Sequence, residues 1–215
     1  MTTTDLHRRA LVRRRDSHIF AREPHGHYVE RPWCSERLFA VEPFDGTIID
    51  PCAGWGQIPQ AAMAAGYRAL AADIVDRGAY NLVTGLIFER ADFLKEFPFS
   101  TECTFSIVCN PPFDQVEEFA ARALALCPRK VAMICQIRRL PAAHWLQRTP
   151  LYRIYLLTPR PSMPPGTYIE AGGKPQGDRQ DYVWLVWLPG YEGASTVRWL
   201  HRDAGAGSQH RAPGP

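Results

Sequence analysis

The sequence predicts an α/β protein with a doubly wound, mostly parallel sheet and an antiparallel pair of strands at its edge. Short apolar runs alternate with helical segments between residues 47 and 137, as expected of successive βαβ units. The alternation ends beyond residue 150, where residues 151–157 and 182–188 both have strand character with no helical pattern between them. A glycine-rich turn after the first strand predicts a ligand site at the carboxyl edge of the sheet.

The composition fits one soluble domain with modest tails. Of the 215 residues, 46% are hydrophobic and 22% are charged, which is the balance of a chain that can bury a core. We expect a flexible Arg-rich arm over residues 1–24, a single domain over residues 25–202 and a disordered tail over residues 203–215. No run of 18 apolar residues and no signal-like N-terminus is present, so we expect a cytoplasmic protein without a membrane partner.

The cysteines and histidines are scattered, whereas the arginines cluster. The six cysteines form no Cys-x-x-Cys pair and the seven histidines no His-x-x-x-His pair, so we expect reduced core thiols and no metal site. The net charge of +3 is too small to establish a polyanionic partner, yet the arm holds Arg8, Arg9, Arg13, Arg14 and Arg15. Such a cluster is usually solvated, and contact with nucleic acid is its functional alternative.

The first segments of the domain lead into the glycine-rich turn. Residues 24–32 form an irregular segment that is suited to covering a ligand. Residues 33–39 have the helical spacing of large apolar side chains, and a short link, residues 42–46, joins them to the next strand. We therefore expect this helix to pack beside the turn.

Residues 47–59 pass from an apolar strand through the turn into a helix. Gly54 and Gly56 let the backbone turn sharply and leave room for a ligand, while the first amides of the helix offer hydrogen-bond donors. Pro59 fits only the first turn of a helix, and it replaces the third glycine of the dinucleotide fingerprint, which disfavours a dinucleotide. Asp50 at the strand end would attract a cationic ligand, and a plain strand-to-helix connection is the alternative.

The following strands bring further polar side chains to the same edge. Residues 68–74 form a second strand, and the Asp73 carboxylate near its end could accept both hydroxyls of a ribose or cap a helix; the two roles can coexist. Residues 105–109 and 130–137 are buried strands with an amphipathic helix over residues 115–126 between them.

The connection between the last two predicted strands, residues 158–181, is rich in proline and glycine. A loop of this length in a compact domain is usually functional or disordered. The residues after 202 are a polar tail to which we assign no structure.

The motif Asn110-Pro111-Pro112-Phe113 directly follows the strand at residues 105–109. By itself it would indicate only a turn. At the ligand-binding edge it presents an amide oxygen and a backbone carbonyl, which can hold the two hydrogens of a nucleobase amine while Phe113 stacks on the base. If the leaving group is a neutral thioether expelled from a sulfonium, the reaction needs no strong base.

Taken together, these motifs resemble the Rossmann-like methyltransferases that use S-adenosylmethionine, and among them the amino-methyltransferases that act on adenine. The resemblance spans about residues 33–188 and rests on Asp50-Pro51-Cys52-Ala53-Gly54-Trp55-Gly56, Asp73, Asp92-Phe93 and the Asn-Pro-Pro-Phe motif, in that order. Residues 160–166 and 181–187 look like those of small phage or prophage-type DNA methyltransferases.

The resemblance implies a role for each matching residue. The methionine part of the cofactor would be cradled by the turn, with Asp50, Cys52, Ala53, Gly54 and Gly56. The ribose would be held by Asp73 beside Ile74, and the adenine of the cofactor would contact Asp92 and Phe93. The target amine would be positioned by Asn110, Pro111, Pro112 and Phe113, with Asn110 also bordering the cofactor.

Methylation of an adenine amine in DNA is therefore the leading expectation. An RNA base amine or a protein glutamine amide fits the same chemistry, because the motif suits any planar amine. A methyltransferase-like binding protein without turnover is a further alternative, which the intact Asn110 and glycines disfavour. The chain lacks an inserted target-recognition domain, so recognition would fall to residues 158–181 and the arm, and the oligomeric state is not indicated.

Overall fold

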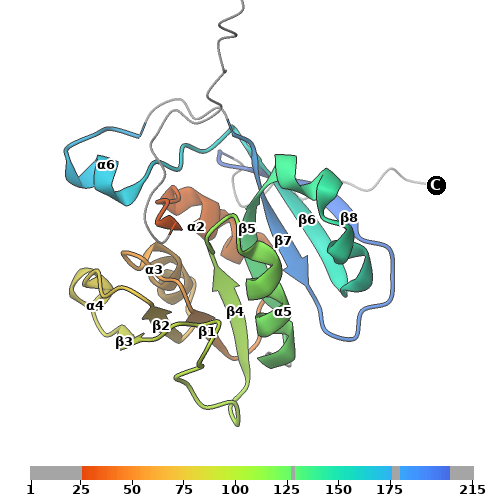
Figure 1. Cartoon of the computed structure of the whole chain (residues 1–215), viewed down its shortest axis with the longest axis horizontal. Helices are drawn as coiled ribbons and strands as arrows, with labels where there is room; N and C mark the ends of the chain where they lie inside the picture. The colour runs from red at the N-terminus through yellow and green to blue at the C-terminus, as the bar shows by residue number, and fades with distance from the viewer. Residues whose placement is uncertain (1–25, 127–128, 176–179, 204–215) are drawn as a thin grey trace, which may run out of the picture.

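The structure is organised around an eight-stranded sheet. The computed structural model describes residues 26–126, 129–175 and 180–203, so the arm and all of the tail except Asp203 lie outside it. The division into arm, domain and tail therefore stays a prediction. The strand order is β3-β2-β1-β4-β5-β7-β6-β8, in which β7 runs antiparallel to both of its neighbours (Figure 1). The strands are β1 (Thr47–Asp50), β2 (Ala69–Asp73), β3 (Ile87–Arg90), β4 (Phe105–Cys109), β5 (Val131–Gln136), β6 (Leu151–Thr158), β7 (Tyr182–Trp187) and β8 (Thr196–His201).

Helices cover both faces of the sheet. One face carries α2 (Pro32–Val41) and α3 (Gln57–Ala64). The other carries α5 (Val116–Leu126) and the 3-10 helices η2 (Ile137–Ala142) and η3 (His144–Arg148) (Figure 1). Two short helices, α4 (Ala79–Leu82) and α6 (Gly166–Glu170), follow β2 and β6. No helix in the described part of the chain is long and apolar enough to cross a membrane.

The predicted parallel sheet and antiparallel pair are both confirmed. Several elements were not expected, namely the 3-10 helices η2 and η3, the strand β8 and the helix α6. The strand β8 pairs parallel with β6, outside the antiparallel pair, and only Leu200 of its six residues is buried, so its sequence shows almost no apolar alternation. The helix α6 forms inside the connection at residues 158–181, and its five residues are too few to show a helical period.

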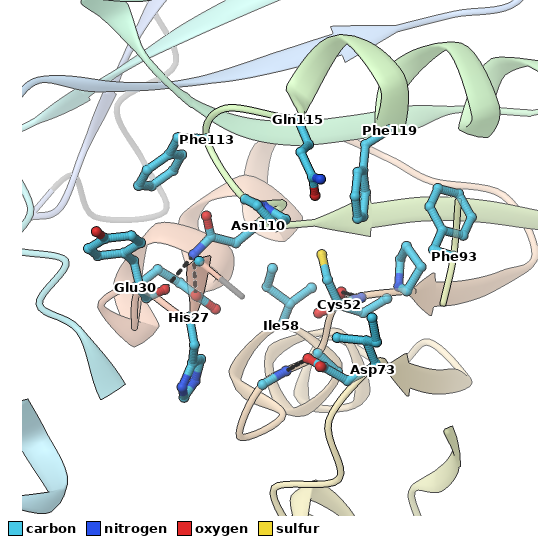
Figure 2. A pocket seen from close by; sticks show the side chains of 18 of the residues that line it. His27, Glu30, Cys52, Ile58, Asp73, Phe93, Asn110, Phe113, Gln115 and Phe119 are labelled. Carbon is cyan, nitrogen blue, oxygen red and sulfur yellow. Dashed lines mark hydrogen bonds between the residues drawn. The ribbon is translucent and has the colours of Figure 1, made fainter. Parts of the chain in front are cut away.

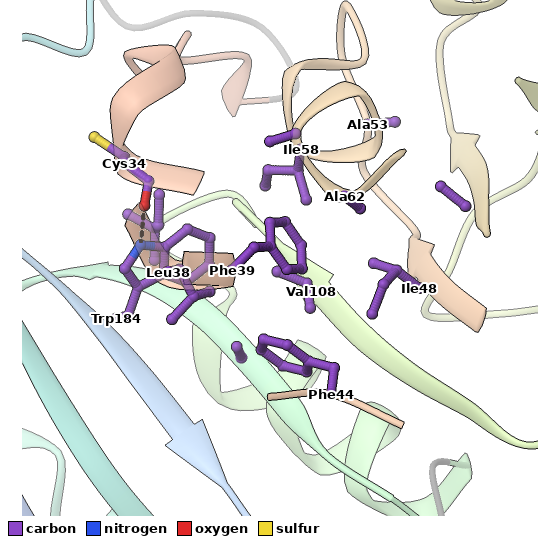
Figure 3. Close-up of a cluster of buried hydrophobic side chains, with 14 of the residues drawn as sticks. Cys34, Leu38, Phe39, Phe44, Ile48, Ala53, Ile58, Ala62, Val108 and Trp184 are labelled. Carbon is purple, nitrogen blue, oxygen red and sulfur yellow. Dashed lines mark hydrogen bonds between the residues drawn. The ribbon is translucent and has the colours of Figure 1, made fainter. Parts of the chain in front are cut away.

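Alternating side chains of the strands divide the core between the two faces. On β1, Ile48 packs with the helices α2 and α3, whereas its neighbour Ile49 packs with α5. On β7, the fully buried Trp184 donates a hydrogen bond from Nε1 to the Cys34 carbonyl of α2 at 3.0 Å (Figure 3). This bond anchors the start of α2 on the sheet, and it thereby helps to fix the residues that lead into α2.

A buried cluster of charges ties the end of α2 to β5 and β6. Glu42 is 1% exposed, and its Oε2 accepts hydrogen bonds from Arg153 and from the Tyr155 hydroxyl, each at 2.7 Å. Its Oε1 pairs with Lys130, which directly precedes β5. Each of the buried charges therefore has an opposite partner, the condition under which proteins tolerate charge burial.

Candidate active site

A cavity of about 680 Å³ opens at the carboxyl ends of β1, β2, β4 and β5 (Figure 2). Asp50, Asp73 and Gln136 are the last residues of their strands, and Asn110 follows β4 directly. Ligand pockets typically measure roughly 300–1,000 Å³, so the cavity is large enough for a nucleoside-sized ligand. Within the described residues, no group of three or more His, Cys, Asp or Glu side chains is placed to hold a metal ion.

Most of the predicted site residues meet at this cavity. Those that line it are Asp50, Cys52, Ala53, Gly54, Asp73, Ile74, Asp92, Phe93, Asn110, Pro112 and Phe113. Gly56 and Pro111 are not among its lining residues. Gly56 has a φ of +85°, and a Cβ there would lie 3.0 Å from Val83 Cγ2, so its backbone conformation and the close packing of the α4 segment explain the glycine.

Asp73 fixes the turn at Gly54. Its Oδ2 accepts the Gly54 amide at 2.9 Å, while its Oδ1 accepts the Val75 amide at 2.9 Å and the Arg77 guanidinium at 2.8 Å. Gly54 has a φ of +54°, which favours glycine. A carboxylate offers roughly four acceptor positions, so one stays open while these three bonds persist. The alternative role of Asp73, as the cap of the helix that follows β2, is not seen among the described helices, because the residue that precedes α4 is Gly78.

Buried carboxylates make the part of the cavity near the turn acidic. Asp50 is 1% exposed and Asp73 is 5% exposed. Burial raises the pKa of the Asp50 carboxyl well above its ordinary value; the Cys52 amide opposes this rise by donating a hydrogen bond, and the carboxylates of Glu30 and Asp73 add to it. A cationic ligand would favour the ionised form of Asp50, because opposite charge lowers a carboxyl pKa.

Phe93 and Asp92 form a wall beside β3. Phe93 is buried, and its ring centroid lies 5.2 Å from that of Phe119 on α5. Asp92 accepts the Leu94 amide at 3.2 Å and pairs with Lys95 at 2.9 Å. The hydrogen bond from Lys95 is the main cause that lowers the pKa of Asp92, so an ionised carboxylate stands at the rim of an apolar wall.

The amide of Asn110 is held by its nitrogen. Its Nδ2 donates to the Tyr28 carbonyl at 2.8 Å and to Glu30 Oε2 at 3.0 Å (Figure 2). A flipped amide would set Oδ1 against the Tyr28 carbonyl, so the backbone of residue 28 selects the observed orientation. The Asn110 Oδ1 is buried and has no hydrogen-bond partner among the described residues. The site thus presents an unused acceptor.

Phe113 belongs to an aromatic cluster. It is 7% exposed, with the Tyr28 ring stacked on it at 5.5 Å and the Tyr182 ring tilted against it at 5.6 Å. The Tyr28 segment is itself held by backbone hydrogen bonds from Val29 to Pro164 and from Gly166 to His27, both at 2.9 Å. Residues 26–30 therefore join the Asn-Pro-Pro-Phe turn to the start of α6.

Among the cavity-lining residues that sequence reasoning missed are Tyr28, Glu30, Gln136 and Tyr182. Gln136 could have been found, because it is a polar residue at the end of an apolar strand, like Asp50 and Asp73. Tyr28 and Glu30 fall within the segment that was expected to cover a ligand, but no pattern singles them out. Their roles arise from contacts with Asn110 and Phe113, which lie about eighty residues further along the chain.

No protein-family model matches the chain, and no curated protein is detectably similar in sequence. Solved structures are similar in fold. PH1948 from Pyrococcus horikoshii, provisionally assigned as an RNA methyltransferase, has a TM-score of 0.51 and 15% identity, covering 74% of this chain and 81% of its own. The protein lmo1582 from Listeria monocytogenes, provisionally assigned as a class I S-adenosylmethionine-dependent methyltransferase, has a TM-score of 0.51 and 9% identity, covering 78% and 62%.

A geranyl diphosphate methyltransferase in complex with GPP and sinefungin has a TM-score of 0.50 and 11% identity, covering 73% of this chain and 76% of its own. At these identities the likeness is one of fold. The order of the strands and the antiparallel β7 agree with it, because they complete a doubly wound sheet whose ligand site lies at the carboxyl edge. The chain therefore has the Rossmann-like fold of the class I S-adenosylmethionine-dependent methyltransferases.

Proposed function

We propose that the protein transfers a methyl group from S-adenosylmethionine to the exocyclic amine of a nucleobase, with adenine in DNA as the first candidate. The observation that carries the proposal is the buried Oδ1 of Asn110, which has no partner among the described residues and belongs to a residue that lines the cavity. The fold supports methyl transfer, because the similar structures carry methyltransferase assignments.

The residues of the cavity fit the cofactor. The open acceptor position of Asp73 suits a ribose hydroxyl, and the buried carboxylates of Asp50 and Asp73 suit a ligand with sulfonium and ammonium charges. Phe93 and Asp92 offer an adenine ring an apolar wall and a hydrogen-bond acceptor. When bound, the cofactor supplies a sulfonium methyl, so that the C–S bond breaks as the N–C bond forms, a neutral thioether leaves and the amine loses a proton to water.

Asn110 would act on the substrate. An exocyclic amine is a weak nucleophile because its lone pair is conjugated with the ring, so a fixed acceptor that aligns the amine lowers the barrier. Oδ1 would accept one hydrogen of the amine. Because Tyr28 already stacks on Phe113, we expect an entering base to displace the Tyr28 ring while the Tyr28 carbonyl keeps its bond to Asn110.

Two arginines at the cavity suit a nucleic acid. Arg138 and Arg139 are exposed on η2 and line the cavity, and Arg138 donates to Gln136 at 3.0 Å. From this position their side chains could contact phosphates that flank a base in the site. RNA is the second candidate, because PH1948 is provisionally assigned as an RNA methyltransferase. The Arg-rich arm lies outside the described residues, and its contact with phosphates stays a prediction.

Replacing both Arg138 and Arg139 with alanine should weaken nucleic-acid binding about equally for all sequences. Each lost phosphate contact should reduce the slope of log affinity against log salt concentration by about one. Fluorescence anisotropy over a salt series measures this slope. Arg68→Ala is the control, because Arg68 is exposed and precedes β2 at the opposite edge of the sheet. An unchanged slope in the double variant would place the phosphate contacts elsewhere.

Asp73→Ala should weaken cofactor binding by about tenfold to a hundredfold, the scale of one or two hydrogen bonds to a charged group. The change also leaves the Gly54 amide without its acceptor, so we expect some loss of stability, which urea unfolding reports separately. Calorimetric titration with the cofactor gives the affinity. The control is Asp76→Ala, since Asp76 is exposed and does not line the cavity. A dissociation constant equal to the wild-type value would limit Asp73 to holding the turn.

The proposed function is tested by offering DNA, RNA and protein in parallel to the protein with S-adenosylmethionine carrying a labelled methyl group. We expect label in DNA, recovered as an adenine methylated on its amine after digestion. Label in RNA or in a glutamine amide would move the same chemistry to that substrate. Cofactor binding without transfer to any of the three would favour a binding protein.

A further inference from the structure

We propose that Glu30 is a positioning residue that fixes the amide of Asn110 for the transfer. The inference rests on the proposed function and deepens it. Glu30 lies in the irregular segment before α2, is 6% exposed and lines the cavity. Its Oε2 accepts a hydrogen bond from Asn110 Nδ2 at 3.0 Å, across 80 residues of sequence (Figure 2). A carboxylate is costly to bury, so this location requires a reason beyond packing.

The geometry explains what Glu30 does to the amide. An amide nitrogen has two hydrogens, and here one is taken by the Tyr28 carbonyl and the other by Glu30. The last side-chain torsion of asparagine has a broad energy well, so an amide held at one point only would swing. With both hydrogens held, Oδ1 keeps one direction before the substrate arrives. If Oδ1 pointed in another direction, the target amine would be misaligned and methyl transfer would be slower.

The charge of Glu30 should act in the same direction. A carboxylate that accepts a hydrogen bond from the amide nitrogen draws electron density toward the amide oxygen, and this polarisation is stronger in a site with little water. The target amine gains positive charge as it forms the new N–C bond. A more negative Oδ1 therefore stabilises the transition state more than the ground state.

Because Glu30 titrates, the positioning and polarisation of the Asn110 amide should depend on pH. Burial raises the pKa of the Glu30 carboxyl, and the hydrogen bond from Asn110 partly opposes the rise. The titratable groups that face it are Asp50 and the thiols of Cys34 and Cys109; burial raises the pKa of both thiols, which keeps them neutral. Because the folded-state pKa is raised, the ionised form, whose charge polarises the Asn110 amide, is present above that pKa and is lost as the pH falls through it.

The first test is a double-mutant cycle measured by single-turnover transfer at saturating cofactor. Glu30→Ala should lower the rate by about tenfold to a hundredfold and leave the cofactor affinity unchanged, since it removes one charged hydrogen bond. Glu30→Gln keeps an acceptor but no charge, so it should recover only the part of the rate that depends on the orientation of the amide. In the Asn110→Ala background, Glu30→Ala should have no further effect on the rate. Glu36→Ala, an exposed change on α2, is the matched control.

A second readout does not depend on turnover. The side-chain amide protons of Asn110, assigned by their absence in Asn110→Ala, should give shifted NMR signals that titrate with pH in the wild type. The pH dependence of these signals should vanish in Glu30→Gln. If Asp50 governed the pH dependence, it would persist in that variant. Additive rate losses in the cycle, or amide signals that neither Glu30 variant moves, would overturn the positioning role. Absence of transfer by the wild-type protein would instead count against the proposed function, and the NMR result would still decide the role of Glu30.

Discussion

Asn110→Ala should cut single-turnover methyl transfer by at least about a hundredfold while leaving cofactor affinity nearly unchanged. That factor is the scale of losing one positioned group that acts in the transition state. The reason lies in the geometry, because Oδ1 is buried without a partner among the described residues while both amide hydrogens are already bound. Rapid-quench measurements at saturating cofactor give the rate, and calorimetry gives the affinity. A fully active Asn110→Ala protein would rule out the amine mechanism.

Asn110→Asp separates the acceptor from the donor side of the amide. A carboxylate still accepts hydrogen bonds, so acceptor chemistry alone predicts that some activity on an amine survives. In the structure, the new oxygen would face the Tyr28 carbonyl and the Glu30 carboxylate, where the amide nitrogen now donates at 2.8 and 3.0 Å. We therefore expect Asn110→Asp to lose more activity than it would if only the hydrogen-bond acceptor mattered. Circular dichroism checks that each variant is folded.

Glu42→Gln should lower the free energy of unfolding by about 3 kcal/mol or more, which is the scale of leaving buried charges without their partner. Glu42 is the shared partner of Lys130 and Arg153, and all three side chains are buried. An uncharged glutamine would keep one acceptor for two cations and would set an amide nitrogen against their donors. Urea unfolding followed by tryptophan fluorescence measures the change.

The control for Glu42 is the exposed pair of Arg160 and Asp181, whose side chains are 47% and 52% exposed. Asp181→Asn should change stability by less than about 1 kcal/mol, because water already screens such a pair. Equal effects of the two variants would mean that the Glu42 cluster contributes no more than a surface ion pair.

Elements that depend on short-range patterns could be predicted from the sequence. The alternation of apolar runs and helices predicted the sheet because side-chain period differs between strands and helices. Gly54 was predicted to open a turn because the left-handed conformation favours glycine, and its φ is +54°. The placement of Asp50, Asp73 and Asn110 at one cavity also followed, because the ends of parallel strands meet at the same edge of a sheet.

Other contacts are encoded by no local pattern and depend on how distant segments pack. The partners of Glu42 lie 88 to 113 residues further along the chain, and Glu30 reaches Asn110 across 80 residues. Gly56 looks in sequence like a second ligand glycine, but a Cβ at this position would meet side chains of the α4 segment, and Gly56 does not line the cavity. The strand β8 has only one buried residue, so its sequence has no alternating apolar pattern. It is a strand because it pairs with β6. Such contacts arise only when distant segments pack, because burial and hydrogen-bond partners depend on the whole fold.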